Sequence, residues 1–274
     1  MVYEAIAKAL TEQHIDLFSA VKLSECKITK KYLLDKAGID ICTGSAVMIA
    51  IPYFVKDDTV GNISEYAKSR DYHLFFATLF EELLPKLRSE FAEYKFEGFV
   101  DHSPIDEINA SAMAGLGMIG ANGLLITEKY SSFIFLGEII TDAPIQCVKK
   151  EITLCESCGL CMNSCPVGCD KHGCLSAITQ KKGDLTEAEK ELILANGSAW
   201  GCDICQKICP HTQKALKSGS IYSNIPFFSE KRTSRLTYQA VEEMSEDEFK
   251  ERAYSWRGKG VLLRNLLLLE SLNK

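Results

Sequence analysis

Residues 155–166 read CESCGLCMNSCP, which is the pattern C-x2-C-x2-C-x3-C-P. This spacing is typical of cysteines that bind [4Fe–4S] clusters, where three thiolates wrap one cluster and the fourth ligates another. The pattern therefore predicts that Cys155, Cys158 and Cys161 bind one cluster, while Cys165 binds a second.

A partial second copy of the pattern follows at residues 202–210, which read CDICQKICP. Cys202 and Cys205 are expected to ligate the second cluster, and Cys209 is expected to cross back and complete the first. The sequence therefore predicts two [4Fe–4S] clusters in one small module.

The ligand set of the second cluster lacks one thiolate, for which Cys174 and Cys169 are the candidates. Nine of the twelve cysteines lie between residues 155 and 209, and a reducing cytosol does not sustain disulfides at such density. A pair of zinc ribbons is the alternative, because C-x2-C is also a zinc spacing. Zinc ribbons, however, use paired knuckles rather than three cysteines followed by x3-C-P.

The composition is that of an ordinary globular protein, with 46% hydrophobic and 25% charged residues in 274. The formal net charge of −6 excludes a uniformly basic coat for nucleic acid. No run approaches the ~18 apolar residues of a membrane helix, and Glu4 and Lys8 interrupt the pattern of a signal peptide. We therefore expect a cytoplasmic monomer with no membrane partner.

The apolar patterns predict an α+β fold rather than a doubly wound sheet, because strands and helices do not alternate strictly. Residues 46–55 are apolar on both faces and should form a central strand. Residues 124–127 and 133–140 are expected to pair as a hairpin. Other strands are expected at 16–23 and 96–101, and helices at 2–14, 27–37, 65–94 and 105–113.

A change of amino-acid composition near residue 150 predicts a domain boundary, because cysteine, glycine and lysine replace β-branched residues there. We expect a catalytic domain at residues 1–150, a double-cluster module at 151–217 and a helical segment at 218–274 that packs on the first domain. Two clusters form a conduit for electrons, which must end at a redox centre or a partner protein. The first domain is large enough to hold that end point.

Several blocks resemble the epoxyqueuosine reductase family, whose members are cobalamin-dependent iron–sulfur enzymes that act on tRNA. The blocks are VDHSPIDE (100–107), AGLGMIGAN (114–122), FLGEIIT (135–141), CLSAIT (174–179), GCDICQ (201–206) and LRN (263–265). The resemblance implies a short form that lacks the family's C-terminal helical repeat domain. It also favours Cys174 over Cys169 as the remaining ligand of the second cluster.

The fold that the resemblance implies is a cobalamin-binding mixed sheet with flanking helices, on which a bacterial-ferredoxin-like double-cluster module packs. The implied reaction reduces epoxyqueuosine to queuosine in tRNA, with electrons from a donor such as a flavodoxin or ferredoxin. One alternative is a corrinoid-dependent reductase of a small molecule, similar to dehalogenases. Another is a non-catalytic protein that transfers electrons or handles corrinoids.

The resemblance also implies roles for single residues. Asp101 is implied as the proton donor beside cobalt, a role that suits a carboxyl of raised pKa. Alternatively it caps the following helix, which Ser103 could do equally well. The implied corrin contacts are Gly115, Gly117, Gly120, Asn122 and Leu125. The glycines could instead form a tight structural turn, and Asn122 could hold a left-handed conformation.

Two histidines and a set of basic residues are further candidates. His73 lies in a D-Y-H sequence that resembles one in the family, and we expect a hydrogen-bonded structural residue rather than a cobalt ligand. His102 adds a second polar group beside Asp101. The basic residues could meet tRNA phosphates, although glutamates interrupt the run and a solvated surface is the alternative. They are Lys231, Arg232, Arg235, Arg252, Arg257, Lys259 and Arg264.

Overall fold

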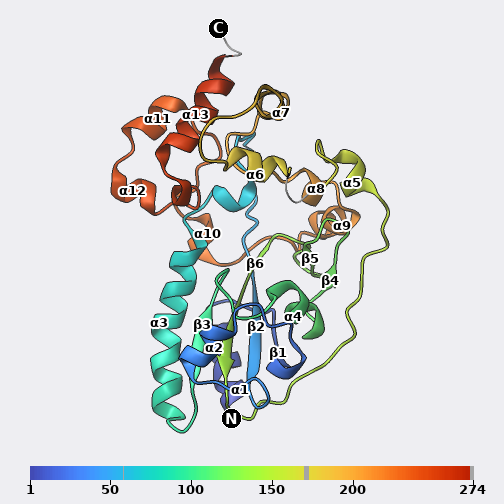
Figure 1. Ribbon diagram of the computed structural model, residues 1–274, viewed down its shortest axis with the longest axis vertical. Helices are drawn as coiled ribbons and strands as arrows, with labels where there is room; N and C mark the ends of the chain where they lie inside the picture. Colours follow the sequence, from blue (N-terminus) through green and yellow to red (C-terminus); the bar gives the residue numbers. More distant parts are fainter. Residues whose placement is uncertain (58, 170–172, 272–274) are drawn as a thin grey trace.

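The computed structural model describes residues 1–57, 59–169 and 173–271. Within these ranges, a β-sheet with the strand order β1-β2-β6-β3 forms the lower half of the molecule in Figure 1, and all its neighbouring strands are antiparallel. The strands are β1 (Phe18–Lys22), β2 (Ser45–Pro52), β3 (Phe96–Phe99) and β6 (Ile134–Thr141). β2 is central and buried throughout, as its continuous apolar run predicts.

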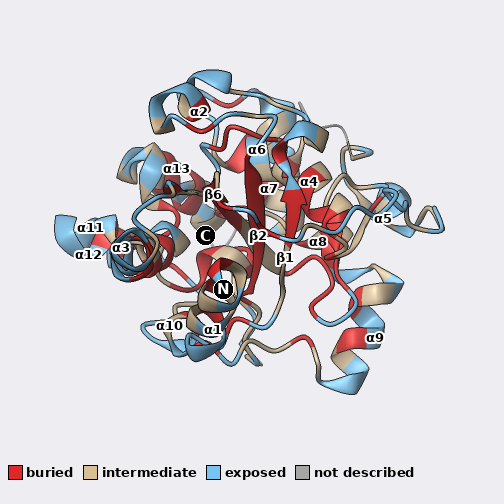
Figure 2. Cartoon of the chain, turned by 90° about the horizontal axis from the view of Figure 1, so that it is seen from below, coloured by how far each residue is buried: buried red, intermediate tan, exposed pale blue. Residues whose placement is uncertain are grey.

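Helices cover both faces of this sheet, which explains why β2 is apolar on both sides. One core joins the helices α1 (Val2–Glu12) and α3 (Tyr72–Glu90) to one face of β2. The opposite core holds α2 (Lys31–Ala37) and α4 (Glu107–Met113). Alternate residues of β2 enter the two cores because successive side chains of a strand point to opposite faces. Figure 2 shows these strands buried between exposed helices.

The predicted α+β fold with flanking helices is confirmed, but the sheet is antiparallel rather than mixed. The predicted hairpin is wrong, because β5 (Leu125–Ile126) pairs with β4 (Met118–Ile119) in a separate small sheet. A tight turn between Thr127 and Ser131, whose backbone groups bond to each other, then redirects the chain. β6 can therefore pair with β2 on one side and β3 on the other.

The predicted helix at residues 65–94 is divided, but not at its proline. A 3₁₀ turn at Glu65–Ala67 is separated from α3, whose N-terminus is capped by the Asp71 side chain through the backbone N–H of His73. Pro85 lies inside α3 without ending it. The cap therefore decides where the long helix begins.

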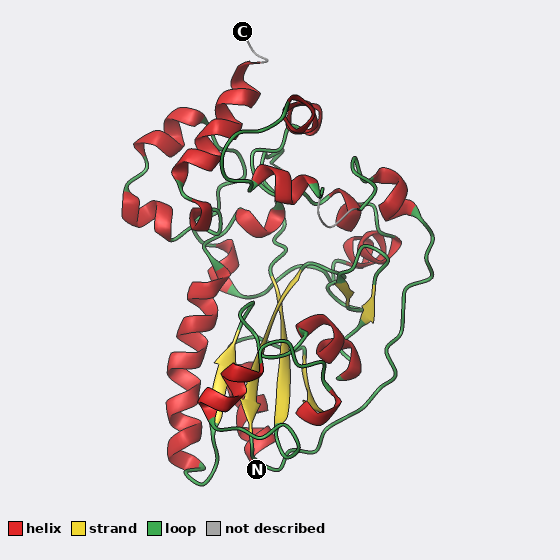
Figure 3. Cartoon of the chain, in the orientation of Figure 1, coloured by secondary structure: helices red, strands yellow, loops and turns green. Residues whose placement is uncertain are grey.

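The cysteine-rich part of the chain lies above the sheet in Figures 1 and 3 and consists of short helices. They are α5 (Leu160–Ser164), α6 (Leu175–Thr179), α7 (Glu187–Asn196), α8 (Ile204–Lys207) and α9 (Pro210–Ser218). An extended segment, residues 142–159, runs along one side of the molecule and joins β6 to α5 (Figure 1). Its end pairs with β4 through bonds between Ile119 and the backbone of Thr153 and Cys155.

The C-terminal helices bridge the two halves of the molecule. They are α10 (Pro226–Ser229), α11 (Tyr238–Glu243), α12 (Glu246–Lys250) and α13 (Lys259–Glu270). Phe228 of α10 packs in the sheet's core, while the later helices surround Trp200 and Tyr254. The three-domain division remains a prediction. In the part of the chain that the structure describes, no helix has the length and apolarity to cross a membrane.

Candidate functional site

Four cysteines from two distant parts of the chain line one cavity of about 380 Å³. They are Cys155, Cys158, Cys161 and Cys209, the predicted ligands of the first cluster. The loop wraps tightly because Ser157 and Gly159 have left-handed φ angles of 51° and 78°. Pro210 occupies the first turn of α9 directly after Cys209, where its missing N–H leaves no hydrogen bond unmade. The four cysteine sulfurs around this cavity fit the ligand set of the predicted [4Fe–4S] cluster.

The glycine-rich loop lies against this cavity. The backbone N–H of Ala121 donates to Sγ of Cys155 at 3.2 Å, and Asn122 lines the cavity wall. Gly115 and Gly117 line another cavity of about 500 Å³, which shares the residues Ile126, His211 and Lys214 with the first. Hydrogen bonds to cluster sulfurs tune reduction potentials. The loop predicted to meet the corrin is therefore adjacent to the first predicted cluster.

Close packing accounts for two of these glycines, against backbone at Gly117 and against side chains at Gly120. A Cβ atom on Gly117 would lie 2.4 Å from the carbonyl oxygen of Ile126, and one on Gly120 would lie 2.5 Å from Oδ1 of Asn122. The tight-turn alternative is thus sufficient to explain both. Leu125 is buried in the core beside α4. Corrin contacts by these residues remain a prediction.

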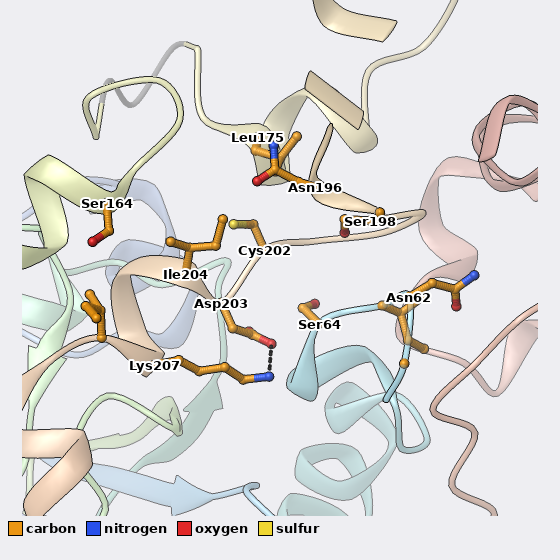
Figure 4. Close-up of a pocket in the computed structure, with 14 residues that line it drawn as sticks. Asn62, Ser64, Ser164, Leu175, Asn196, Ser198, Cys202, Asp203, Ile204 and Lys207 are labelled. Atoms are coloured by element: carbon orange, nitrogen blue, oxygen red, sulfur yellow. Dashed lines mark ion pairs between the residues drawn. The ribbon is translucent and has the colours of Figure 1, made fainter. Parts of the chain in front are cut away.

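The other predicted ligands gather at a second place in the cysteine-rich part. Cys165 directly follows α5 and Cys174 directly precedes α6, and Cys202 lines a cavity of about 400 Å³ (Figure 4). Burial raises the pKa of the Cys205 thiol, and the thiols of Cys174 and Cys165 raise it further. Cys202 lies near Cys205 and Cys174 in turn, but Cys161 and Cys169 also lie beside Cys205, so this set of four ligands remains a prediction.

Cys169, the predicted spare, donates its thiol to the carbonyl oxygen of Cys161 at 3.3 Å. Residues 170–172, between Cys169 and Cys174, lie outside the described residues. Across the described ranges, no three histidine, cysteine, aspartate or glutamate side chains gather closely enough for a single metal ion. A four-iron cluster is a larger body than one ion and spreads its ligands more widely.

Asp203, between Cys202 and Cys205, anchors this module to the N-terminal half. Its Oδ2 accepts from the backbone N–H of Glu65 at 2.8 Å and lies 3.6 Å from Nζ of Lys207, an ion pair drawn in Figure 4. Gly201 is required at this contact, because a Cβ there would lie 2.0 Å from Oγ of Ser64. The GCDICQ block therefore combines ligands with an anchor.

The LRN block buttresses the module from the other side. The buried amide of Asn265 donates to the carbonyl oxygens of Thr179 and Ala199 at 2.6 and 2.9 Å. Arg264 donates to the carbonyl oxygen of Lys181 at 2.8 Å. This block therefore has a structural role, because it joins α13 to the end of α6 and to the loop that precedes Cys202.

A separate polar site surrounds Asp101, which follows β3 with a left-handed φ of 58°. Its carboxylate is 58% exposed and accepts a hydrogen bond from the hydroxyl of Tyr72. Nε2 of His73 lies 3.3 Å from the same oxygen, and Nδ1 of His73 lies 2.8 Å from Asp71. The rings of Tyr72 and Phe135 stack at 4.0 Å, which fixes the tyrosine.

Neither Asp101 nor Ser103 caps α4, so the capping alternative is wrong for both. The cap is Asp106, whose Oδ1 accepts from the backbone N–H of Asn109 at 3.3 Å. His102 bonds instead to the hydroxyl of Tyr32 at 2.7 Å. The carboxylate of Asp101 is therefore left available for chemistry.

The surroundings lower the pKa of Asp101, whereas a raised value was expected. Burial raises it, but hydrogen bonds from His73 and Tyr72 outweigh that cost. The pKa of His73 rises to about 10, because Asp101 and Asp71 both hydrogen-bond to it. At neutral pH the imidazole therefore holds the proton of this pair. Raised carboxyl pKa values occur nearby, at Glu107 and Glu138.

The His73 pair should make stability depend on pH. Because its folded pKa exceeds the ordinary 6.5, its stabilisation should be complete below about pH 6.5 and be lost as pH rises through about 10. We expect the difference in unfolding free energy between wild type and His73→Gln to shrink over that range. Urea unfolding at several pH values measures it, and a constant difference would contradict the charged pair.

Most of the basic residues proposed to meet tRNA form contacts within the chain, and the solvated-surface alternative is wrong for Arg232 and Arg252, whose side chains are 12% and 7% exposed. Arg232 pairs with Glu65 in a buried network, and Arg252 is buried and donates to the carbonyl oxygen of Lys231. Ion pairs also engage Lys231 with Glu251 and Lys259 with Glu246. Interleaved glutamates account for the pairs of Lys231 and Lys259, whereas Arg232 pairs with a distant residue of the chain. For Arg235 and Arg257 a phosphate contact remains a prediction.

Sequence reasoning missed three residues of the Asp101 site: Tyr72, Glu107 and Glu138. Tyr72 lies in the same D-Y-H sequence as His73. Glu138 carried a readable signal, because it is a glutamate inside an otherwise apolar strand and is fully buried. A charged residue is rarely buried without a partner, so its position alone pointed to another polar group.

Comparison with known proteins identifies the family. The family model described as Epoxyqueuosine reductase QueG, DUF1730 matches residues 42–102. An epoxyqueuosine reductase of Synechocystis sp. is 32% identical over 197 residues, which cover 67% of this chain and 68% of that relative. The chain belongs to the epoxyqueuosine reductase family. The resemblance seen in the sequence is thus confirmed.

Other epoxyqueuosine reductases are longer than the stretch they share with this chain. The enzyme of Salmonella typhimurium is 35% identical over 164 residues, which cover 57% of this chain and 42% of that enzyme. The chain spans about half the length of such curated relatives; for the Aliivibrio fischeri enzyme the share is 45%.

Solved epoxyqueuosine reductases have the same fold. The structure from Streptococcus thermophilus has a TM-score of 0.73 and 23% identity, covering 96% of this chain and 79% of that one. A crystal structure of an epoxyqueuosine reductase with an epoxyqueuosine-modified tRNA-Tyr stem loop has a TM-score of 0.75 and 22% identity. It covers 98% of this chain and 81% of that one.

Proposed function

We propose that this protein is an iron–sulfur and cobalamin-dependent reductase that converts epoxyqueuosine to queuosine in tRNA. The observation that carries the proposal is the cavity walled by all four predicted ligands of the first cluster. Together with membership of the epoxyqueuosine reductase family, this cysteine arrangement favours a redox enzyme. A relative solved with an epoxyqueuosine-modified tRNA stem loop supports tRNA as the substrate.

The proposed reaction removes the epoxide oxygen as water. Two C–O bonds break, a C=C bond forms, and the oxygen takes up two protons while the carbon skeleton takes up two electrons. Asp101 is the proposed proton donor at the site, and His73 holds the proton from which Asp101 is supplied. Tyr72 orients the carboxylate through its hydroxyl. Asp101 is exposed enough to meet a large substrate.

The cysteine geometry fits the two proposed [4Fe–4S] clusters. The first would be held by Cys155, Cys158, Cys161 and Cys209, and the second by Cys165, Cys174, Cys202 and Cys205. Cobalamin, when bound, would supply the low-valent metal that delivers electrons to the epoxide. Gly115 and Gly117, which line a cavity, and Asn122, beside the first cluster site, are the proposed contacts for it.

The electrons are proposed to come from a small redox protein such as a flavodoxin or ferredoxin. The 115–122 loop touches the first cysteine cavity through the bond from Ala121 to Cys155, so electrons that enter the cluster module are proposed to reach the corrin site through the first cluster. Boundaries at residues 150 and 217 are proposed to separate the catalytic domain, the double-cluster module and the C-terminal helical segment.

Anaerobic reconstitution with iron, sulfide and cobalamin tests this proposal directly. We expect about eight irons from two four-iron clusters and one cobalt per chain. The loaded protein should convert an epoxyqueuosine-containing anticodon stem-loop to the queuosine form when a chemical reductant is supplied. Full cofactor loading without any conversion would refute the substrate, while zinc in place of iron would refute the redox role.

A further inference from the structure

Two glutamates that the proposed chemistry does not use meet behind Asp101. Glu138 lies in β6 and is 0% exposed, and Glu107 is the first residue of α4. Glu107 bonds to the backbone of Asp101 and Glu138 bonds to Ser103, so both carboxyls lie against one short loop, and each perturbs the pKa of the other. Within the described ranges neither carboxyl has an ion-pair partner, and Lys30 acts on Glu107 only from a distance.

The hydrogen bonds of this pair leave a gap that a proton would fill. Oε1 of Glu138 accepts from the hydroxyl of Ser103. Oε2 of Glu138 is buried, and no donor from the described residues reaches it. An ionised carboxylate only accepts hydrogen bonds, whereas a protonated carboxyl also donates one. Two carboxyls can therefore bond to each other only while they retain a proton.

Both glutamates are tied to the loop that carries Asp101. Oε1 of Glu107 accepts from the backbone N–H of Asp101 at 3.3 Å. Ser103, which donates to Glu138, also accepts from the backbone N–H of Ile105 at 3.1 Å. The loop is therefore held at both ends by this one carboxyl pair. Holding is needed because a left-handed φ at a residue other than glycine costs free energy.

We propose that Glu107 and Glu138 share one proton and act as positioning residues that latch the Asp101 loop in its reactive conformation. The inference rests on the proposed function only for the role of Asp101. While the pair keeps its proton, the two carboxyls attract each other and the loop stays in place. Once the proton is lost, two adjacent anions repel and the loop is released.

The charges around the pair agree with a retained proton on Glu138. Burial raises the pKa of Glu138, and the neighbouring carboxylates of Glu107 and Asp101 raise it further. Burial and the charge of Asp101 likewise raise the pKa of Glu107, while Lys30 opposes the shift. Burial raises the pKa of the nearby Cys26 thiol, so this neighbour carries no charge either. Glu107 at the start of α4 is the better place for the negative charge.

Hydrogen–deuterium exchange of residues 100–105 in the full, cluster-loaded chain tests the latch. After correction for the intrinsic pH dependence, wild-type protection should be high at neutral pH and fall as the pair loses its proton. Glu107→Ala should speed exchange about tenfold, as expected for one lost hydrogen bond. Glu107→Gln should keep protection at every pH, because its amide donates to Glu138 whether or not that carboxyl is ionised.

Infrared spectroscopy provides the second measurement. Wild type should show a protonated carboxyl at neutral pH, and Glu138→Gln should lack it. A spectrum without that band, or unchanged exchange in a folded Glu107→Ala protein, would overturn the latch. Neither measurement uses tRNA, so a failure of the proposed reaction and a failure of the latch give different results. Retained protection in Glu107→Gln guards against a simple folding defect.

Discussion

Asp101→Asn is expected to lower the rate of epoxyqueuosine reduction by about 10²–10⁴-fold, the range for loss of a general acid. Asparagine has the same size and tolerates the left-handed conformation of residue 101. It can still bond to Tyr72 and His73, but it cannot carry a transferable proton. Single-turnover conversion of an epoxyqueuosine stem-loop by the cofactor-loaded protein measures the effect.

Asp106→Asn is the matched control for this variant. It changes the same side chain five positions along the chain, at the N-cap of α4. Asparagine caps helices as well as aspartate does, so conversion should continue at the wild-type rate. Iron and cobalt contents should be equal in all three proteins. A full rate in Asp101→Asn would remove Asp101 from the chemistry.

Cys158→Ser is expected to abolish turnover and to cost about four irons of about eight, because one [4Fe–4S] cluster loses a thiolate ligand. Cys158 is exposed in the cysteine cavity, so its replacement disturbs no packed core. The reduced protein should keep the spectroscopic signal of the second cluster alone. Iron counting and electron paramagnetic resonance measure both quantities.

Three further cysteine variants distinguish cluster ligands from cysteines that bind no cluster. Cys42→Ser, at an exposed position in the sheet domain, should keep all the iron and serves as the control. Cys174→Ser should lose the second cluster, whereas Cys169→Ser should keep both clusters, because Cys174, which lies beside Cys202 and Cys205, is the predicted fourth ligand. Iron loss in Cys169→Ser with full iron in Cys174→Ser would reverse the assignment of the eighth ligand.

The cysteine cavity could be predicted from the sequence because its geometry is largely local. Three predicted ligands of the first cluster lie within seven consecutive residues, 155–161, so spacing alone places them around one centre. The central position of β2 was also readable, since a strand that is apolar on both faces must be covered on both. Periodicity along the chain carries this information directly.

Contacts between segments far apart in the chain could not be predicted from the sequence in the same way. The sequence places β5 and β6 next to each other, but the structure pairs β6 with β2 and β3. Many strand pairings satisfy the same alternation of apolar residues, and the free energy of the whole core selects among them. The basic residues near the C-terminus likewise found partners such as Glu65, far away in the chain.

The sequence by itself determined the predicted ligand chemistry, because thiolates at short, regular spacings can close on one cluster wherever the module lies. Only the tertiary structure decided which groups around Asp101 are protonated. It brought His73 to Asp101 and Glu107 to Glu138, and so lowered the pKa of Asp101 while raising those of the two glutamates. A pKa depends on burial and on charges within a few ångströms, and those neighbours come from elements that only folding brings together.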